Sequence, residues 1–268
     1  MSALEGFTET SFEDHGVARP VFRRGSGPGV VVMHEIPGIT PEVARFARWV
    51  ADAGFTVAMP RLFGTPGKPF SQGYALGQMV RACIGHEFHV LASRGASPIT
   101  EWLRTLARAL HAELGGVGVG AIGMCLTGNF ALSLMLDECL MAPVLSQPSL
   151  PFPLTRERAG AIHLSDEDLA RVKERVRAGV PVLGLRFTAD PVCRRARFET
   201  LARELGTAFE AIEIDSSPGN AWGIPRHAHS VVTKDLVDRE GHPTAAARDR
   251  VIAFFRERLQ GRAEAASR

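Results

Sequence analysis

The chain has 268 residues, of which 45% are hydrophobic and 22% charged, as in an ordinary soluble globular protein. Its formal net charge is +2, from 31 Lys and Arg against 29 Asp and Glu, and no basic run is present that would attract nucleic acid. No apolar run is long enough to cross a membrane, and the polar opening, MSALEGFTETSFEDH, lacks the features of a secretory signal. With four cysteines and no CxxC pair, we expect free thiols and a cytoplasmic location.

The length favours one large α/β domain over two small ones, and it allows a sizeable core without disulfide bonds. We expect a single domain over residues 1–260. The last residues, 261–268 (GRAEAASR), are expected to form a flexible tail.

The first part of the chain predicts a strand–helix–strand unit. Residues 17–24 (VARPVFRR) alternate enough for an edge strand, and Val30–His34 is an apolar run typical of a buried parallel strand. A helix capped by Thr40 begins at Pro41, and the next strand is FTVAMP at 55–60.

Residues 61–96 are rich in Gly and Pro, and we expect a long loop there with one short helix at about 73–84, an excursion of the kind that is often functional. Strands and helices alternate beyond it. The expected helices are 97–114, 129–140, 165–178, 193–205 and 244–259, and the expected strands lie within 115–123, 142–146, 180–187 and 208–214. This alternation predicts a mostly parallel sheet with helices on both faces.

A thiol stands at the corner where one of these strands turns into a helix, in the stretch AIGMCLTGNF. Cys125 lies between Gly123 and Gly128, which would let neighbouring backbone pack closely. Such a corner forces an uncommon backbone conformation, a strain of about 1–3 kcal/mol. The N-terminus of the following helix favours the thiolate, and the amide of Leu126 would point toward an oxyanion beside the sulfur.

Four chemically active side chains follow strands of the predicted sheet. Glu35, Cys125, Asp190 and His229 each come after a strand or after its connecting loop. Ligands of parallel sheets bind at the carboxyl ends of the strands, so these side chains are expected to meet there. The order nucleophile, acid, histidine along the chain is the order of the α/β-hydrolase fold.

The sequence resembles the dienelactone hydrolase family of α/β-hydrolases from about residue 20 to 258. The resemblance rests on VVVMHEIPGIT at 30–40, GMCLTG at 123–128, FTADP at 187–191 and HAHSVVT at 227–233. It implies an α/β-hydrolase fold, no cofactor and no metal, and hydrolysis of a small ester or lactone. It also implies the site residues, which are the nucleophile Cys125, the acid Asp190, the histidine His229 and the glutamate Glu35.

In such a site His229 would act as the base for Cys125, and Asp190 would hold the imidazole in one tautomer. The resemblance implies that Glu35 contacts the thiol in the resting protein and helps to deprotonate it when substrate binds. The amides of Ile36 and Leu126 would form the oxyanion hole. The expected reaction passes through a thioester acyl-enzyme that water then hydrolyses.

Two positions depart from the family pattern. Thr127 stands where the family elbow usually has glycine, and its β-branched side chain is expected to crowd the turn. Thr233 stands where the family member that acts on dienelactone has an arginine, with Lys234 next. Arg81, in the 61–96 excursion, is a candidate to hold a substrate carboxylate if that segment folds over the site; as an alternative it is a surface charge.

Several alternatives remain open. His227 competes with His229 as the base, although the His-Ser pair at 229–230 matches the family. His86, Glu87 and His89 (HEFH) lack the spacing of HExxH, so we interpret them as a packed or solvated patch and not as a metal site. A glutaminase-like enzyme would need a glutamate near the downstream histidine. Another alternative for the function is a catalytically idle scaffold that binds a small ligand. The segment QPSLPF at 147–152 is either a wall of the pocket or a plain loop.

Overall fold

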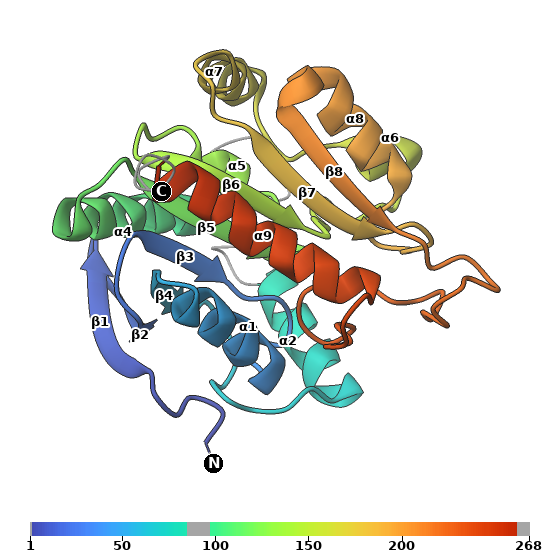
Figure 1. Cartoon of the computed structure of the whole chain (residues 1–268), viewed down its shortest axis with the longest axis horizontal. Coiled ribbons are helices and arrows are strands. Elements are labelled where there is room, and N and C mark those ends of the chain that lie inside the picture. The colour runs from blue at the N-terminus through green and yellow to red at the C-terminus, as the bar shows by residue number, and fades with distance from the viewer. Residues whose placement is uncertain (1, 85–96, 262–268) are drawn as a thin grey trace, which may run out of the picture.

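The computed structural model describes residues 2–84 and 97–261 of the chain. Eight strands of the described residues form one sheet in the order β1-β2-β4-β3-β5-β6-β7-β8 (Figure 1). β1 and β2 pair antiparallel with their neighbours, and all other pairs are parallel. The strands are β1 (Thr8–Asp14), β2 (Val17–Arg24), β3 (Gly29–Met33), β4 (Thr56–Pro60), β5 (Val119–Met124), β6 (Leu140–Ser146), β7 (Val182–Phe187) and β8 (Phe209–Ile214).

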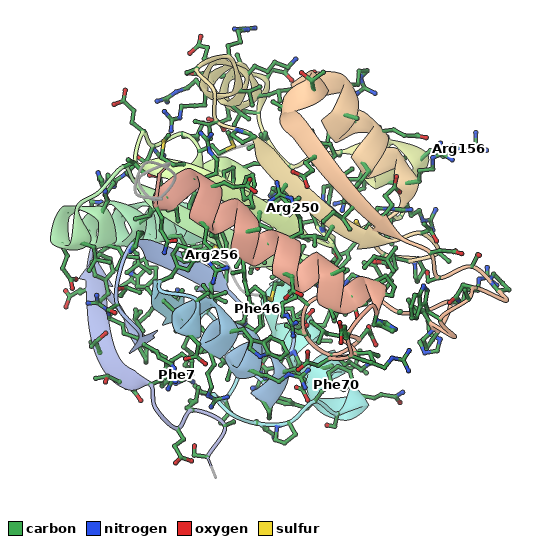
Figure 2. All side chains as sticks on the ribbon, viewed as in Figure 1. Phe7, Phe46, Phe70, Arg156, Arg250 and Arg256 are labelled. Atoms are coloured by element: carbon green, nitrogen blue, oxygen red, sulfur yellow. The ribbon has the colours of Figure 1, made fainter. Side chains whose placement is uncertain are left out.

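Helices cover both faces of this sheet, as the sequence predicts. The helices are α1 (Pro41–Asp52), α2 (Gln72–Ile84), α4 (Pro98–Leu114), α5 (Phe130–Leu134), α6 (Arg156–Gly160), α7 (Asp166–Arg177), α8 (Arg195–Leu205) and α9 (Pro243–Leu259), with short 3₁₀ turns η2 (Cys125–Thr127) and η3 (Gly206–Ala208). α1 and α9 pack on one face, and α4, α5, α7 and α8 contribute to the core on the other. Phe46 of α1, labelled in Figure 2 between α1 and α9, is fully buried.

The strands divide their side chains between the two cores with a period of two. In β3, Val30 and Val32 belong to the core under α1 and α9, whereas Val31 and Met33 belong to the core under α4. A strand buried on both faces needs apolar residues at every position, which is why the sequence of β3 is a continuous apolar run.

Local signals place the helix starts. The hydroxyl of Thr40 accepts a hydrogen bond from the N–H of Val43 at the start of α1, and Ser97 with Thr100 forms a reciprocal capping box on α4. At α7, Ser165 accepts from the N–H of Asp168 at 3.0 Å. The predicted cap of α1 is therefore confirmed.

Two predictions of local structure are wrong. The edge position that is predicted for residues 17–24 is taken by the unpredicted strand β1. The helix predicted over 129–140 ends after one turn, because Leu140 pairs with Val119 as the start of β6. The short helix α6 lies in a stretch for which the sequence made no prediction.

Ion pairs hold the chain where the predicted helix ends early. The carboxylate of Asp137 forms ion pairs with the guanidinium groups of Arg104 at 2.6 Å and Arg108 at 2.8 Å. Arg175 donates to the carbonyls of Glu138 and Leu140, both at 2.8 Å. Contacts with distant elements thus override the helical propensity of this apolar stretch.

No helix among the described residues is long and apolar enough to cross a membrane. The HEFH patch lies outside the described residues, as does the expected tail apart from Gly261.

Candidate active site

The corner after β5 has the conformation that the sequence predicts. Cys125 adopts φ +52°, in the left-handed region that side chains rarely occupy, and it is half-buried. A β-carbon on Gly123 would lie 2.0 Å from the carbonyl oxygen of Thr127, and one on Gly128 would lie 2.4 Å from the Cα of Pro148. Both glycines are therefore required for the chain to make this turn.

Thr127 does not crowd the corner but ties it to the neighbouring strand. Its side chain is fully buried, and its Oγ1 accepts a hydrogen bond from the N–H of Met124 at 2.9 Å. The carbonyl oxygens of Met33 and His34, at the end of β3, lie 3.0 and 3.2 Å from the same hydroxyl. The expectation of crowding is wrong because the hydroxyl fills a site with matching donors and acceptors.

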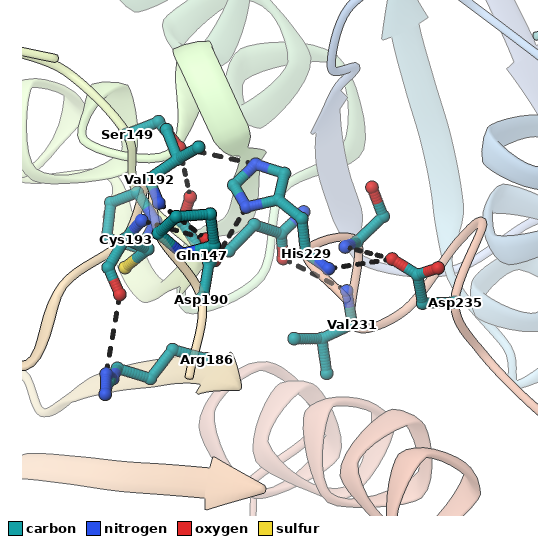
Figure 3. A network of polar contacts seen from close by, with 12 residues as sticks. Gln147, Ser149, Arg186, Asp190, Val192, Cys193, His229, Val231 and Asp235 are labelled. Atoms are coloured by element: carbon teal, nitrogen blue, oxygen red, sulfur yellow. Dashed lines mark hydrogen bonds and ion pairs between the residues drawn. The ribbon is translucent and has the colours of Figure 1, made fainter. Parts of the chain in front are cut away.

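Asp190 and His229 meet at the carboxyl ends of the strands, as Figure 3 shows. Asp190 Oδ2 lies 2.6 Å from Nδ1 of His229, and its Oδ1 accepts from the N–H groups of Val192 at 2.8 Å and Cys193 at 3.2 Å. The carboxylate thus initiates a turn and also holds the imidazole. Because one oxygen is fixed by the backbone, the other is aimed at His229.

The other side of the imidazole faces the thiol. His229 interacts with the side chain of Cys125, and Ser149 Oγ lies 3.4 Å from its Nε2. Burial lowers the pKa of His229, but the charge of Cys125 and the hydrogen bond with Asp190 outweigh burial and raise that pKa well above its ordinary value. His227, the competing candidate, is exposed at the rim of the cavity. The site geometry therefore favours His229 over His227.

Asp235 positions the loop that carries His229. Its Oδ2 accepts hydrogen bonds from the backbone N–H groups of His229 at 2.8 Å and Ser230 at 2.9 Å (Figure 3). The sequence analysis missed this residue, because an aspartate six positions after a histidine carries no motif.

Glu35 is buried, with 4% of its surface exposed, and three neutral side chains donate to its carboxylate. Oε1 accepts from the hydroxyl of Thr233, and Oε2 accepts from Ser230 Oγ at 2.8 Å and from Gln147 Nε2 at 3.2 Å. Burial raises the pKa of Glu35, against the lowering effect of the bond from Thr233. Among the hydrogen bonds of the described residues, none joins Glu35 to Cys125, unlike the resting contact that the resemblance implies.

The loop after β6 carries two further site residues that the sequence analysis missed. The N–H of Ser149 donates to the carbonyl of Cys125 at 2.9 Å, and Gln147, with φ +36°, also accepts from the N–H of Val231 at 3.3 Å. The buried guanidinium of Arg197 holds this loop by donating to the carbonyls of Pro148 and Pro151, both at 2.6 Å. Nothing in the spacing of these residues marks them.

A cavity of about 660 Å³ opens beside Cys125 and His229. Glu35 and Ile36 also line it, and Phe152 forms part of its wall, whereas Pro148 and Pro151 of the QPSLPF segment do not line it. Arg81 is exposed and is not among the described lining residues; Ala75 and Met79 of the same helix are. The side chain of Leu126 is buried in the core, and the oxyanion hole from the amides of Ile36 and Leu126 stays a prediction.

Other titratable side chains near the site are not available for chemistry. Burial lowers the pKa of His34 to about 4, and its ring bonds to the carbonyl of Glu35 and the N–H of Leu62, so it is not a base. Burial raises the pKa of Cys193, and it also raises that of Cys139, which lies at the opposite end of β6 from the site. Within the described part of the chain, no group of His, Cys, Asp and Glu has the arrangement of a metal site.

Solved structures with this fold include several hydrolases. A putative dienelactone hydrolase from Klebsiella pneumoniae is 19% identical and aligns with a TM-score of 0.61 over 93% of this chain and 97% of its own. A dienelactone hydrolase-like promiscuous phosphotriesterase from metagenomic libraries is 19% identical, with a TM-score of 0.62 over 94% of this chain and 98% of its own. A cold-adapted esterase from an Arctic intertidal metagenomic library is 16% identical, with a TM-score of 0.57 over 94% and 92%. These likenesses show the α/β-hydrolase fold.

No curated protein sequence gives a significant match. The sequence model of the dienelactone hydrolase family, however, matches residues 17–259, which is most of the chain and includes every site residue discussed above. The chain therefore belongs to the dienelactone hydrolase family, and it is a hydrolase of the class that acts on esters or lactones.

Proposed function

We propose that the protein hydrolyses an ester or lactone through a covalent intermediate on Cys125, with His229 as base and Asp190 as the group that orients it. The observation that carries the proposal is the pair of partners of His229. The buried carboxylate of Asp190 lies 2.6 Å from Nδ1, and the thiol of Cys125 is the other partner, at the edge of a cavity. A nucleophile and a base oriented by a third group are the recurrent parts of acyl-transfer sites.

In the first half of the proposed reaction, His229 takes the proton of the thiol, and the sulfur of Cys125 attacks the carbonyl carbon. The oxyanion of the tetrahedral intermediate would bind the amides of Ile36 and Leu126, and losing one such donor costs about 10²–10³ in rate. The carbon–oxygen bond to the leaving alkoxide then breaks. His229 returns the proton to that oxygen, leaving a thioester.

In the second half, His229 removes a proton from water, and the hydroxide attacks the thioester carbonyl. The carbon–sulfur bond breaks, which releases the carboxylic acid and regenerates Cys125. Asp190 stabilises the imidazolium that forms in each half, because it stays bound to Nδ1.

We propose a different role for Glu35 from the one that the resemblance implies. Its three donors come from the loops that carry His229 and Ser149, so the carboxylate fixes these loops against the end of β3. The raised pKa of His229 makes the imidazole a better proton acceptor, so no second base is needed. Glu35 is then a positioning residue, and His229 alone receives the thiol proton.

The alternative is an idle scaffold that binds a small ligand. The unusual Thr127 supported this hypothesis at the level of the sequence, but the hydroxyl of Thr127 holds the corner together. The proposal retains a cytoplasmic location, which the free thiols of Cys125, Cys139 and Cys193 support.

Two measurements test the proposal. Iodoacetamide should alkylate Cys125 near neutral pH much faster than Cys139, whose pKa burial raises. Aryl acetate hydrolysis should be abolished by Cys125→Ala and retained by the matched control Cys139→Ala. Unchanged turnover in the Cys125→Ala variant would show that the nucleophile is another group. Fast alkylation without turnover of any ester or lactone would favour the idle scaffold.

A further inference from the structure

The walls of the cavity beside Cys125 are largely apolar. Most of the surface of its described lining is apolar, and it comes from segments that are far apart in the sequence, with Ile36, Pro37, Ala75, Met79, Phe152 and Val192 among the residues that contribute. Its volume of about 660 Å³ lies within the range of about 300–1,000 Å³ typical of sites for drug-sized ligands. An acetyl group or a small polar lactone would leave most of this surface without contacts.

The charged groups of the cavity lie where they cannot hold an anion at depth. Arg194 and Lys234 are exposed at the rim, and the ammonium of Lys234 already lies 4.3 Å from the ring centroid of Phe70, which Figure 2 labels beside α2. Three carboxylates, from Glu35, Glu42 and Asp235, also line the cavity.

Neither Thr233 nor Arg81 supplies a cation inside the cavity. Thr233 stands where the family member that acts on dienelactone has an arginine; it is fully buried, and its hydroxyl is bound to Glu35. Arg81 is exposed on α2 and outside the described lining. Among the described lining residues, therefore, no buried arginine or lysine is available to a carboxylate on the substrate.

We propose that the natural substrate is an ester or lactone with a large apolar body of six or more carbons and no carboxylate at its far end. The inference rests on the proposed function, because the apolar body fills the cavity while its carbonyl lies at Cys125. Each buried methylene should raise kcat/KM about three- to fourfold until the cavity is filled, the factor that corresponds to about 0.8 kcal/mol per CH₂.

The test is a series of aryl esters with acyl chains of two, four, six and eight carbons, together with alkyl esters of one small acid with alcohols of the same lengths. We expect kcat/KM to rise at least about tenfold from the shortest to the longest member of one series. A terminal carboxylate on the six-carbon acyl chain should remove that gain, because a buried unpaired charge is costly. Flat or falling rates in both series, or faster turnover of the carboxylate ester, would overturn the inference.

Two variants on one helix make the test specific to the cavity. Met79→Gln places an amide in the apolar wall and should lower the ratio of long-chain to short-chain kcat/KM at least about fivefold. Val80→Gln, at the next residue and outside the described lining, should leave that ratio unchanged. Equal ratios in the two variants would contradict the assignment of the wall. One outcome separates the two proposals. If Cys125→Ala abolishes hydrolysis of the acetyl ester, but the wild type shows no preference for longer chains, the substrate class is refuted and the proposed function stands.

Discussion

Replacing Thr127 with valine isolates the contribution of one buried hydroxyl to the catalytic corner. The two side chains have nearly the same shape, and the position is fully buried, so the substitution opens no cavity and exposes nothing. It removes the acceptor for the N–H of Met124, at 2.9 Å, and the donor that faces the carbonyls of Met33 and His34.

The expected loss of stability follows from these contacts. Leaving one buried N–H without a partner costs about 1–3 kcal/mol, and the lost donation by the hydroxyl adds about 1 kcal/mol. The extra methyl group of valine offsets part of this, so we expect a net loss of about 1–3 kcal/mol. For a domain of this size each kcal/mol shifts Tm by about 2–4 °C, which gives a decrease of roughly 3–10 °C.

Thermal unfolding followed by circular dichroism measures this change, and aryl ester turnover reports on the corner itself. Thr127→Ser is the matched control, because it keeps the hydroxyl and loses only a methyl group. We expect Thr127→Val to lose more activity than Thr127→Ser, since the unpaired amide belongs to the residue before Cys125. A Tm for Thr127→Val within about 1 °C of the wild type would refute the view that this hydroxyl stabilises the corner.

Three further predictions concern the same site. In Cys125→Ser the pKa of His229 should fall, because the electrostatic interaction with Cys125 is the largest cause that raises it; NMR titration of the imidazole checks this, and an unchanged value would contradict an interaction between the two side chains. Gly123→Ala should yield little folded protein, because its β-carbon would lie 2.0 Å from the Thr127 carbonyl oxygen; a soluble variant with the wild-type Tm would contradict that packing. Glu35 has a raised pKa, so its contribution to stability is complete below 4.5 and is lost as the pH rises through the folded-state pKa. Urea unfolding of Glu35→Gln should therefore show a free energy that increases relative to wild type between pH 4 and 8, and a constant difference would count against the raised pKa.

The fold could be predicted where the sequence carries its own periodicity. The continuous apolar run of β3 and the cap at Thr40 are local signals, and the structure confirms both. Strand β1 could not be recognised, because one edge strand exposed over most of its length needs no apolar alternation. The early end of α5 depends on Arg104, Arg108 and Arg175, which come from other elements and leave no mark near residues 135–139.

Some site residues could likewise be predicted from the sequence, and others depend on contacts with distant elements. Cys125, Asp190 and His229 each follow a strand, and the topology of a parallel sheet brings such residues together whatever the intervening sequence is. The prediction that Arg81 binds substrate depended on how the 61–96 segment folds. Helix α2 of that segment presents Met79 to the cavity and not Arg81. The role of Glu35 could not be read from its position after a strand, because that role depends on which donors surround the carboxylate.

These donors explain why the family pattern can change in the His229 loop while His229 and Asp190 stay together. Three loops, after β3, β6 and β8, meet at Glu35, and their side chains satisfy one another there with the hydroxyls and amide of Ser230, Thr233 and Gln147. A buried network of this kind specifies one arrangement only while every member is satisfied, since an unpaired buried group costs more than the bond it loses. Thr233 therefore does two things at once: it completes the network around the carboxylate, and it leaves the cavity without the arginine that the family member acting on dienelactone has at this position. The same residue thus links the position of the His229 loop to the substrate class that we propose for the cavity.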